Sequence, residues 1–173
     1  FRHTIIRPNH THITSGMAAD PGEEGRRYDE LIRSLGGVDI QLLGIGHTGH
    51  IGFNEPNTYF IAPTHRVALN PLTIEANARF FASEEDVPRY AITMGLGSIM
   101  AAKRILLVAS GEDKAEILYR SFFGPITPQI PASILQLHPD VTVVAEHNAL
   151  EVIRAKAPEM VEDGFPNGAA GLG

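Results

Sequence analysis

Two patterns of hydrophobic and polar positions recur along the chain, one typical of amphipathic helices and one typical of buried strands. The helical pattern begins at Asp20, a favoured N-cap residue, with Pro21 at the first helical position. Apolar residues then recur at helical spacing, namely Tyr28, Leu31, Ile32 and Leu35. Because Gly36-Gly37 follows and disfavours further helix, the pattern predicts one helix that ends before these glycines.

Short runs of branched apolar residues predict strands that are buried in a parallel sheet. The runs are Val38–Leu43, Tyr90–Met94, Arg104–Ala109 and Val141–Ala145, and helical patterns lie over Thr73–Phe81, Ser98–Lys103, Glu112–Phe123 and Ala132–His138. This alternation predicts the α/β class, with an open, mostly parallel, Rossmann-like sheet and helices on both faces. Such folds bind ligands beyond the carboxyl ends of their strands.

Composition limits the domain organisation and the class of partner. The 173 residues, 43% of them hydrophobic, suffice for one core, and we expect a single α/β domain over residues 1–157 and a mobile glycine- and proline-rich tail over residues 158–173. The formal net charge is -6 and no run of Lys or Arg occurs, which argues against a nucleic-acid partner. No apolar stretch approaches the ~20 residues of a membrane-spanning helix, and cysteine is absent, so we expect a cytoplasmic protein without a membrane partner.

The segment Gly44–Pro56 holds the strongest candidate chemistry. Its run Gly44–Gly49 matches the dinucleotide-binding pattern G-x-G-x-x-G, but the glycine, asparagine and proline that follow make a poor helix. Residues 64–70 also lack the acidic residue that would bind a ribose hydroxyl. His47 and His50 form a single H-x-x-H without an acidic cluster, which is a weak indication of zinc. We therefore expect no cofactor and no metal.

The remaining interpretation of this segment is proton transfer. His50 can exchange a proton near neutral pH, and Glu55 could orient it or supply a compensating charge if turns at Gly49 and Gly52 bring the two together. The alternative is an ordinary loop histidine and a solvated carboxylate, and the residues alone leave both open. We expect His47 to be a bystander.

A longer stretch carries a specific resemblance to a known family. The run from Leu43 to Pro56, LGIGHTGHIGFNEP, resembles the signature of the glucosamine-6-phosphate deaminase/isomerase family. The similarity covers about residues 37–148 and continues, in the family's order and nearly its spacing, through Ala76–Phe81, Val87-Pro88, Ala91–Gly97, Gly111–Ala115 and Leu135–Pro139.

The resemblance implies an activity and a catalytic pair. In that family the histidine that matches His50 assists opening of the sugar ring, and the glutamate that matches Glu55 binds and tunes it. The implied enzyme is an amino-sugar phosphate isomerase/deaminase, which converts glucosamine-6-phosphate to fructose-6-phosphate and ammonia without metal or cofactor. It is expected to count as a hydrolase as well as an isomerase, and to serve amino-sugar catabolism and N-acetylglucosamine utilisation. Its expected partner is a small sugar phosphate; a homo-oligomer is compatible with this but is not predicted.

The resemblance also implies substrate-binding residues. Arg79 and Lys114 match the family's phosphate-binding cations, and Gly46 and Gly49 belong to its substrate-binding loop. Lys114 stands out on physical grounds as well, because it lies in the first turn of a predicted helix, where the helix dipole favours an anion such as phosphate. The alternatives are that Lys114 extends to solvent and that Arg79 covers aromatic edges.

Three departures from the family pattern qualify these expectations. Thr48, which we group with the catalytic residues, stands where many members carry an aspartate, so the protonated form of His50 is expected to be less stabilised than in those members. Val67 lies near the position of the lysine of allosterically regulated members, so allosteric control is not expected. The family's phosphate loop and the aspartate that moves the C2 proton precede the matching segment. We therefore expect a sheet that lacks its N-terminal strand and an isolated chain that is inactive.

Two other functions stay open at this stage. The retained motifs report phosphate binding and ring opening more clearly than the configuration at C4, so a galactosamine-6-phosphate isomerase/deaminase is the enzymatic alternative. A non-catalytic sugar-phosphate sensor is the alternative from another class. The related 6-phosphogluconolactonases share the expected architecture but not the signature as written.

Overall fold

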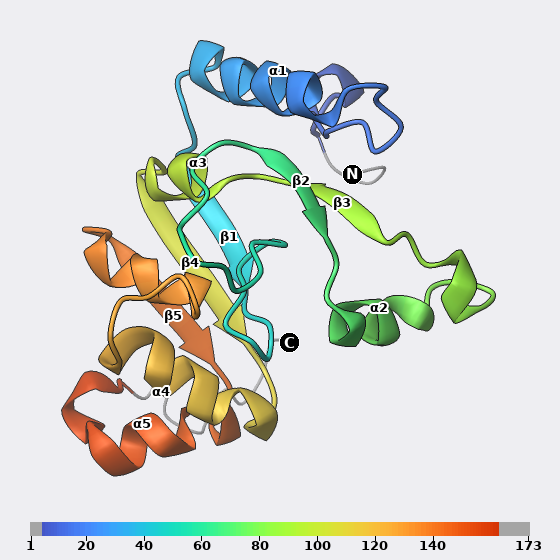
Figure 1. Ribbon diagram of the computed structural model, residues 1–173. Coiled ribbons are helices and arrows are strands. Elements are labelled where there is room, and N and C mark those ends of the chain that lie inside the picture. The colour runs from blue at the N-terminus through green and yellow to red at the C-terminus, as the bar shows by residue number, and fades with distance from the viewer. Residues whose placement is uncertain (1–4, 163–173) are drawn as a thin grey trace, which may run out of the picture.

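A three-stranded parallel sheet lies at the centre of the molecule (Figure 1). The computed structural model describes residues 5–162. Its sheet has the order β1-β4-β5, formed by β1 (Ile40–Gly44), β4 (Arg104–Ala109) and β5 (Val141–Ala145). Because the three strands run in the same direction, their carboxyl ends meet at one edge, and the predicted α/β class with a parallel sheet is confirmed.

Helices precede or follow each strand. The α-helices are α1 (Pro21–Ser34), α2 (Pro71–Ala78), α3 (Leu96–Met100), α4 (Ala115–Phe123) and α5 (Glu151–Lys156). Short 3-10 helices are η1 (Pro8–His10), η2 (Glu84–Asp86), η3 (Glu112–Lys114), η4 (Pro131–Leu137), η5 (Asn148–Leu150) and η6 (Pro158–Met160). The predicted helix over Ala132–His138 is the 3-10 helix η4, whose Ser133 hydroxyl bonds the backbone N–H and C=O of Thr127 at 2.8 and 3.0 Å and ties the segment into a tight turn.

The core lies on one face of the sheet. Leu107 in β4 is completely buried, and it belongs to the same apolar cluster as Leu118 of α4 and Leu135 of η4. The opposite face of the sheet carries exposed apolar side chains, namely Ile40, Leu42, Val108 and Val144. Within residues 5–162, β1 pairs only with β4, so its outer edge has no strand beside it, as expected for a sheet without its N-terminal strand.

A separate antiparallel ribbon consists of β2 (His65–Ala68) and β3 (Tyr90–Thr93), and it leads away from the sheet towards α2 (Figure 1). The sequence pattern placed Tyr90–Met94 in the parallel sheet, and this was wrong. A short apolar run predicts a strand but not its partner, and β2 lacked a recognised pattern. The two strands are also joined by Arg66, whose guanidinium lies 4.1 Å from the centre of the Tyr90 ring.

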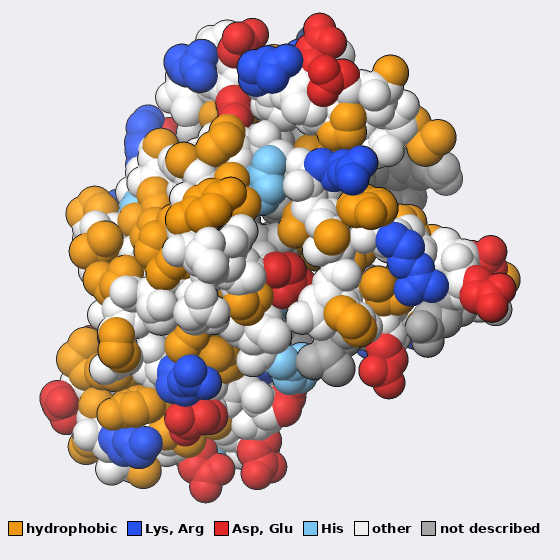
Figure 2. Space-filling model, viewed as in Figure 1, with side chains coloured by type: hydrophobic (Ala, Val, Ile, Leu, Met, Phe, Trp, Pro, Cys, Tyr) orange, Lys and Arg blue, Asp and Glu red, His pale blue; other side chains and the backbone are white. Residues whose placement is uncertain are grey.

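The predicted N-terminal helix is confirmed as α1. The Asp20 carboxylate accepts hydrogen bonds from the N–H groups of Gly22 and Glu23 at 2.8 and 3.0 Å. Asp29 attaches α1 to the rest of the molecule, because its carboxylate accepts from the backbone and hydroxyl of Thr64 and from the hydroxyl of Ser98. Charged side chains gather over the outer surface of α1 (Figure 2).

The C-terminal segment begins with η6, and Val161 packs against the core. The rest of the predicted tail, residues 163–173, lies outside the described residues. Along residues 5–162, no helix is both long enough and apolar enough to cross a membrane.

Candidate active site

The loop after β1 folds back on itself through two glycines. The N–H of Gly46 donates to the carbonyl of His50 at 3.0 Å, and the N–H of Gly49 donates to the carbonyl of Gly46 at 2.9 Å. Gly49 has φ +79, in the left-handed region that glycine adopts most readily. A Cβ on Gly46 would lie 2.1 to 2.2 Å from Cε1 and Nε2 of His50, so only glycine leaves room for the imidazole against the loop.

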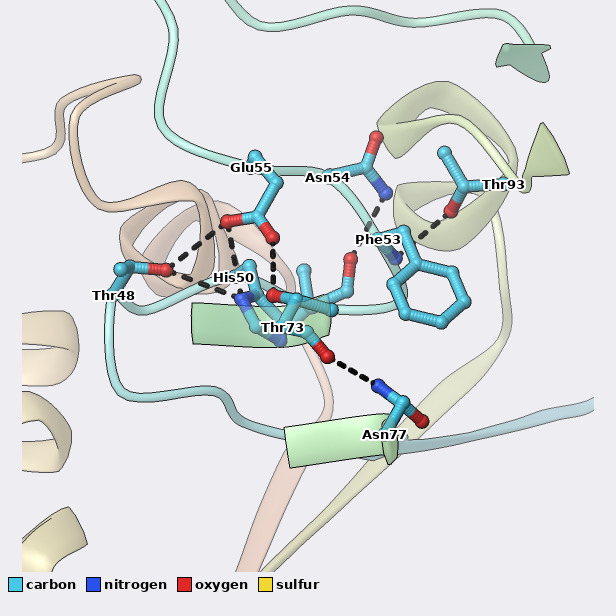
Figure 3. Close-up of polar contacts among 9 residues, drawn as sticks. Thr48, His50, Phe53, Asn54, Glu55, Thr73, Asn77 and Thr93 are labelled. Carbon is cyan, nitrogen blue, oxygen red and sulfur yellow. Dashed lines mark hydrogen bonds and ion pairs between the residues drawn. The ribbon is translucent and has the colours of Figure 1, made fainter. Parts of the chain in front are cut away.

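This fold of the loop brings His50 and Glu55 together, as the resemblance to the family implies (Figure 3). Nδ1 of His50 lies 3.3 Å from Oε2 of Glu55, and their side chains are 20% and 11% exposed. Thr48 lies beside the pair, because its hydroxyl is 3.1 Å from Nδ1 of His50 and donates to Oε2 of Glu55 at 3.3 Å. The three side chains therefore form one hydrogen-bonded group, in which every contact to the imidazole uses Nδ1.

The second oxygen of Glu55 is held from α2. The hydroxyl of Thr73 donates to Oε1 at 2.8 Å (Figure 3). Thr73 itself is buried. Burial alone would raise the pKa of Glu55, but the hydrogen bond and charge of His50, together with the hydroxyls of Thr73 and Thr48, outweigh it and hold this pKa below its ordinary value. Glu55 is therefore a carboxylate at neutral pH.

The chain between His50 and Glu55 is hydrogen-bonded to the end of β3 and to the residue that follows it. The N–H of Phe53 donates to the hydroxyl of Thr93 at 3.0 Å. The amide nitrogen of Asn54 donates to the carbonyls of Ile51 and Met94 at 3.0 and 2.9 Å, and Asn54 is buried. These bonds connect the loop to the ribbon. The position of Glu55 is therefore determined by the ribbon as well as by α2, which supplies Thr73.

Lys114, which lies in η3, extends its side chain to the pocket that His50 also lines. The side chain of Lys114, in η3, is only 13% exposed, and its Nζ lies 2.7 Å from Nε2 of His47 and donates to Oδ2 of Asp113 at 2.5 Å. Nε2 of His47 also contacts Oδ2 of Asp113. The hydrogen bond from Lys114, with a smaller contribution from His47, holds the pKa of Asp113 below its ordinary value.

These side chains surround a pocket of about 210 Å³ at the carboxyl end of β1. It is lined by Gly46, His47, Thr48, His50, Phe53, Asn70, Thr73, Asn77 and Lys114. Figure 3 shows Glu55 and Thr48 joined to His50, Thr73 of α2 joined to Glu55, and Asn77 of α2 joined to the carbonyl of Thr73. Lys114 and His50 line this pocket, and Glu55 contacts His50 from outside the lining, an arrangement that suits an anionic ligand that undergoes proton transfer.

Of the other residues considered in the sequence analysis, His47 lines the pocket and Arg79 does not. Arg79, just beyond α2, is not among the residues that line the pocket, and its guanidinium lies 4.7 Å from the centre of the Phe80 ring. His47, expected to be a bystander, lines the pocket and contacts Lys114. Thr73, Asn77 and Asp113 were missed by the sequence reasoning. The four-residue spacing of Thr73 and Asn77 places them on one helical face, which was the available signal.

No group of three or more His, Cys, Asp or Glu side chains within residues 5–162 could hold a metal ion.

Together, the parallel α/β sheet and its strand-end pocket define an α/β fold with a small polar pocket beside a histidine–carboxylate pair. The chain belongs to the family of glucosamine-6-phosphate isomerases/6-phosphogluconolactonase, whose model matches residues 1–144.

Relatives of known name support this assignment. The chain is 57% identical over 144 residues to a glucosamine-6-phosphate deaminase from Lachnoclostridium phytofermentans, covering 83% of this chain and 61% of that protein. It is 50% identical over 161 residues to one from Clostridioides difficile, covering 93% of this chain and 65% of that protein. The chain thus spans about three fifths of the length of these relatives.

Solved structures agree with the family assignment. A monomeric glucosamine-6-phosphate deaminase is similar with a TM-score of 0.84 and 49% identity, covering 88% of this chain and 63% of that one. A 6-phosphogluconolactonase from Trypanosoma cruzi shares the fold, with a TM-score of 0.54, 19% identity, and coverage of 78% of this chain and 54% of that one.

These comparisons correct one expectation. The sequence interpretation counted the enzyme as a hydrolase, and this was wrong, because the relatives and the similar solved structure are named deaminases, which is a different class. The same names favour neither the galactosamine-6-phosphate enzyme nor a non-catalytic sensor.

Proposed function

We propose that this chain carries the ring-opening half of a glucosamine-6-phosphate deaminase active site, in a protein that converts glucosamine-6-phosphate to fructose-6-phosphate and ammonia. The observation that carries the proposal is the His50–Glu55 pair at a pocket that also contains Lys114. Relatives 50% and 57% identical that bear this name support the choice of substrate.

His50 is the proposed catalytic acid and base. Its Nδ1 is occupied by Thr48 and Glu55, which leaves Nε2 to exchange a proton with a ligand. Opening of a sugar ring requires a proton to leave the C1 hydroxyl and a proton to reach the ring oxygen, and one imidazole can do both in turn. The Glu55 carboxylate stabilises the imidazolium that forms between the two transfers, and Thr48 helps to hold the ring in place.

The phosphate group is proposed to bind near Lys114. A cation that is 13% exposed beside a small pocket retains more of its attraction for a dianion than a lysine in open solvent. Arg79 is proposed as a second phosphate ligand, and its guanidinium could form the bidentate contact that phosphate favours once it leaves the Phe80 ring.

Gly46 and Gly49 are proposed to shape the substrate-binding surface. Their N–H groups already donate within the loop, so Gly46, which lines the pocket, contributes by contact and by the absence of a side chain, whereas Gly49 contributes the turn of the loop. We propose that residues 1–157 form the single domain that presents these groups, followed by a tail.

The proposed setting is amino-sugar catabolism during N-acetylglucosamine utilisation, in the cytoplasm, where a soluble sugar phosphate is the partner and no nucleic acid or membrane is involved. No metal or cofactor is proposed for the reaction. The similar solved structure is that of a monomeric protein, and oligomer formation is not part of the proposal.

The test is an ammonia-release assay on the full-length protein with glucosamine-6-phosphate and galactosamine-6-phosphate. We expect turnover of the glucosamine substrate, a fall in kcat of roughly 10²- to 10⁴-fold for His50→Asn, and a smaller fall for Glu55→Gln, which keeps the shape of the side chain but removes its charge. His10→Asn is the matched control, because His10 is exposed in η1. Wild-type activity in His50→Asn, or ammonia release from the galactosamine substrate alone, would refute the proposal.

A further inference from the structure

Lys114, His47 and Asp113 form a triangle that the ring-opening chemistry does not use. Nζ of Lys114 lies 2.7 Å from Nε2 of His47, and both groups contact the same oxygen, Oδ2 of Asp113. The two basic groups come from different segments, since His47 follows β1 and Lys114 lies in η3 before α4. Both line the pocket that contains His50.

The hydrogen bonds within this triangle compete. Nε2 of His47 can hold one proton, so it can either accept a bond from Lys114 or donate a bond to Asp113, but not both. Oδ2 of Asp113 is the only one of the three atoms that can accept from both others. A negatively charged oxygen between a lysine and a histidine is also the arrangement in which a phosphate oxygen is bound.

Exposure distinguishes the three side chains. Lys114 is 13% exposed, whereas His47 and Asp113 are 61% and 53% exposed. Asp113 can therefore turn towards water at little cost, while Lys114 stays at the pocket. A phosphate group offers several oxygens where Asp113 offers one to both donors, so it can bond Lys114 and His47 through separate atoms.

We propose that His47 is a further ligand of the substrate phosphate and that Asp113 is an internal anion that occupies this site until phosphate displaces it. His47 donates from Nε2 to one phosphate oxygen and Lys114 donates to another. Asp113 lowers affinity, because each binding event must first separate it from both groups. This inference rests on the proposed function in that it assigns part of the same phosphate site.

The experiment measures binding of inorganic phosphate and of glucosamine-6-phosphate to the full-length protein by calorimetry, in parallel with ammonia release. Asp113→Asn removes the competing charge and should tighten phosphate binding about two- to fivefold, the effect of losing one exposed ion pair. His47→Asn is too short to place a donor at Nε2 and should weaken binding about tenfold, whereas His47→Gln, which can reach that position, should restore part of the loss.

Matched controls separate these effects from general changes of charge and folding. Asp39→Asn removes another exposed carboxylate that pairs with a lysine, Lys103, outside the pocket, and should leave phosphate affinity unchanged. The thermal unfolding midpoint of each variant identifies any that is misfolded, and phosphate protection in the thermal shift is then compared among folded variants.

The outcomes also distinguish this inference from the proposed function. Equal or weaker binding in Asp113→Asn, or binding in His47→Asn within twofold of the wild type, overturns the inference even if ammonia release continues. If the variants change phosphate affinity as expected but neither amino-sugar phosphate yields ammonia, the proposed function fails and the inference stands. Absence of measurable phosphate binding by the wild type overturns the inference, and activity of the same sample then decides the proposed function.

Discussion

Thr73 of α2 donates a hydrogen bond of 2.8 Å to Oε1 of Glu55, the oxygen that His50 does not contact. The carboxylate is thus held at both ends, by the imidazole and Thr48 through Oε2 and by α2 through Oε1. Because α2 also contributes Asn77 to the pocket, the same helix contacts the ligand space and orients the carboxylate. We infer that Thr73 is a positioning residue that acts through Glu55.

We therefore expect Thr73→Val to lower kcat/KM near neutral pH by about tenfold, the usual effect of removing one hydrogen bond to a charged group. The Thr73 hydroxyl lowers the pKa of Glu55, so its removal raises that pKa. The acidic limb of the pH profile should move to higher pH, since Glu55 must be ionised to stabilise the imidazolium. Thr73→Ser should restore the profile, and Thr58→Val, at an exposed surface threonine, should not change it. An unchanged acidic limb in Thr73→Val would contradict the positioning role.

Gly46→Ala tests the close approach of the loop to His50. The added Cβ would lie 2.1 to 2.2 Å from the imidazole, so the ring must leave its place between Glu55 and the pocket. We expect kcat to fall by about 100-fold or more, since ~1 Å of misplacement of a catalytic group has effects of this size. Gly16→Ala is the control, because no heavy atom lies within 4 Å of its added Cβ. A Gly46→Ala protein with normal kcat would show that the ring tolerates displacement.

Much of the fold could be predicted from the sequence because local patterns determined it. β4 and β5 coincide with their apolar runs, and α1 begins at its N-cap. The partner of β3 could not be predicted, since pairing depends on which strand approaches through space and β2 is only four residues long. α5 was missed because its six residues are too few to display a helical period.

Some contacts of the candidate site could likewise be predicted from local sequence, and others could not. His50 and Glu55 lie five residues apart in one loop, and the intervening glycines indicated that they could meet. The contacts of Thr73 and of Asp113 cross the fold and carry no local sign: Thr73 lies 18 residues from Glu55, and Asp113 lies 66 residues from His47. Arg79 illustrates the opposite case, in which a residue implied by resemblance lies outside the pocket in this structure.

Lys114 and Arg79 should differ in how they affect substrate binding. Lys114 already lies at the pocket, so Lys114→Ala is expected to raise KM for glucosamine-6-phosphate at least tenfold, by loss of about 1.5–3 kcal/mol from a hydrogen bond between charged groups. Arg79→Ala should also raise KM if α2 carries Arg79 towards the phosphate during binding. Arg33→Ala, at an exposed position of α1, is the control. An unchanged KM in both variants would show that neither Lys114 nor Arg79 binds the substrate phosphate.

The last prediction concerns stability and the attachment of the N-terminal segment to α1. The Glu24 carboxylate accepts two hydrogen bonds of 2.7 Å from the Arg27 guanidinium and one of 2.7 Å from the N–H of Ser15. The bonds from Arg27, followed by that from Ser15, lower the pKa of Glu24 from 4.5 to about 2. Because the folded-state pKa is depressed, the stabilisation is complete above about pH 4.5 and is lost as the pH falls towards 2.

Glu24→Gln removes this linkage, so the variant should be less stable than the wild type at pH 7, and the difference should shrink between about pH 4.5 and 2. Urea unfolding at pH 7, 5 and 3 measures it. Glu23→Gln is the matched control, since Glu23 is exposed on the same helical turn, and its effect should depend little on pH. A constant difference between wild type and Glu24→Gln at all three pH values would mean that the Glu24–Arg27 pair persists in the unfolded chain or contributes nothing to folding, because either case removes the difference in proton binding that produces the pH dependence.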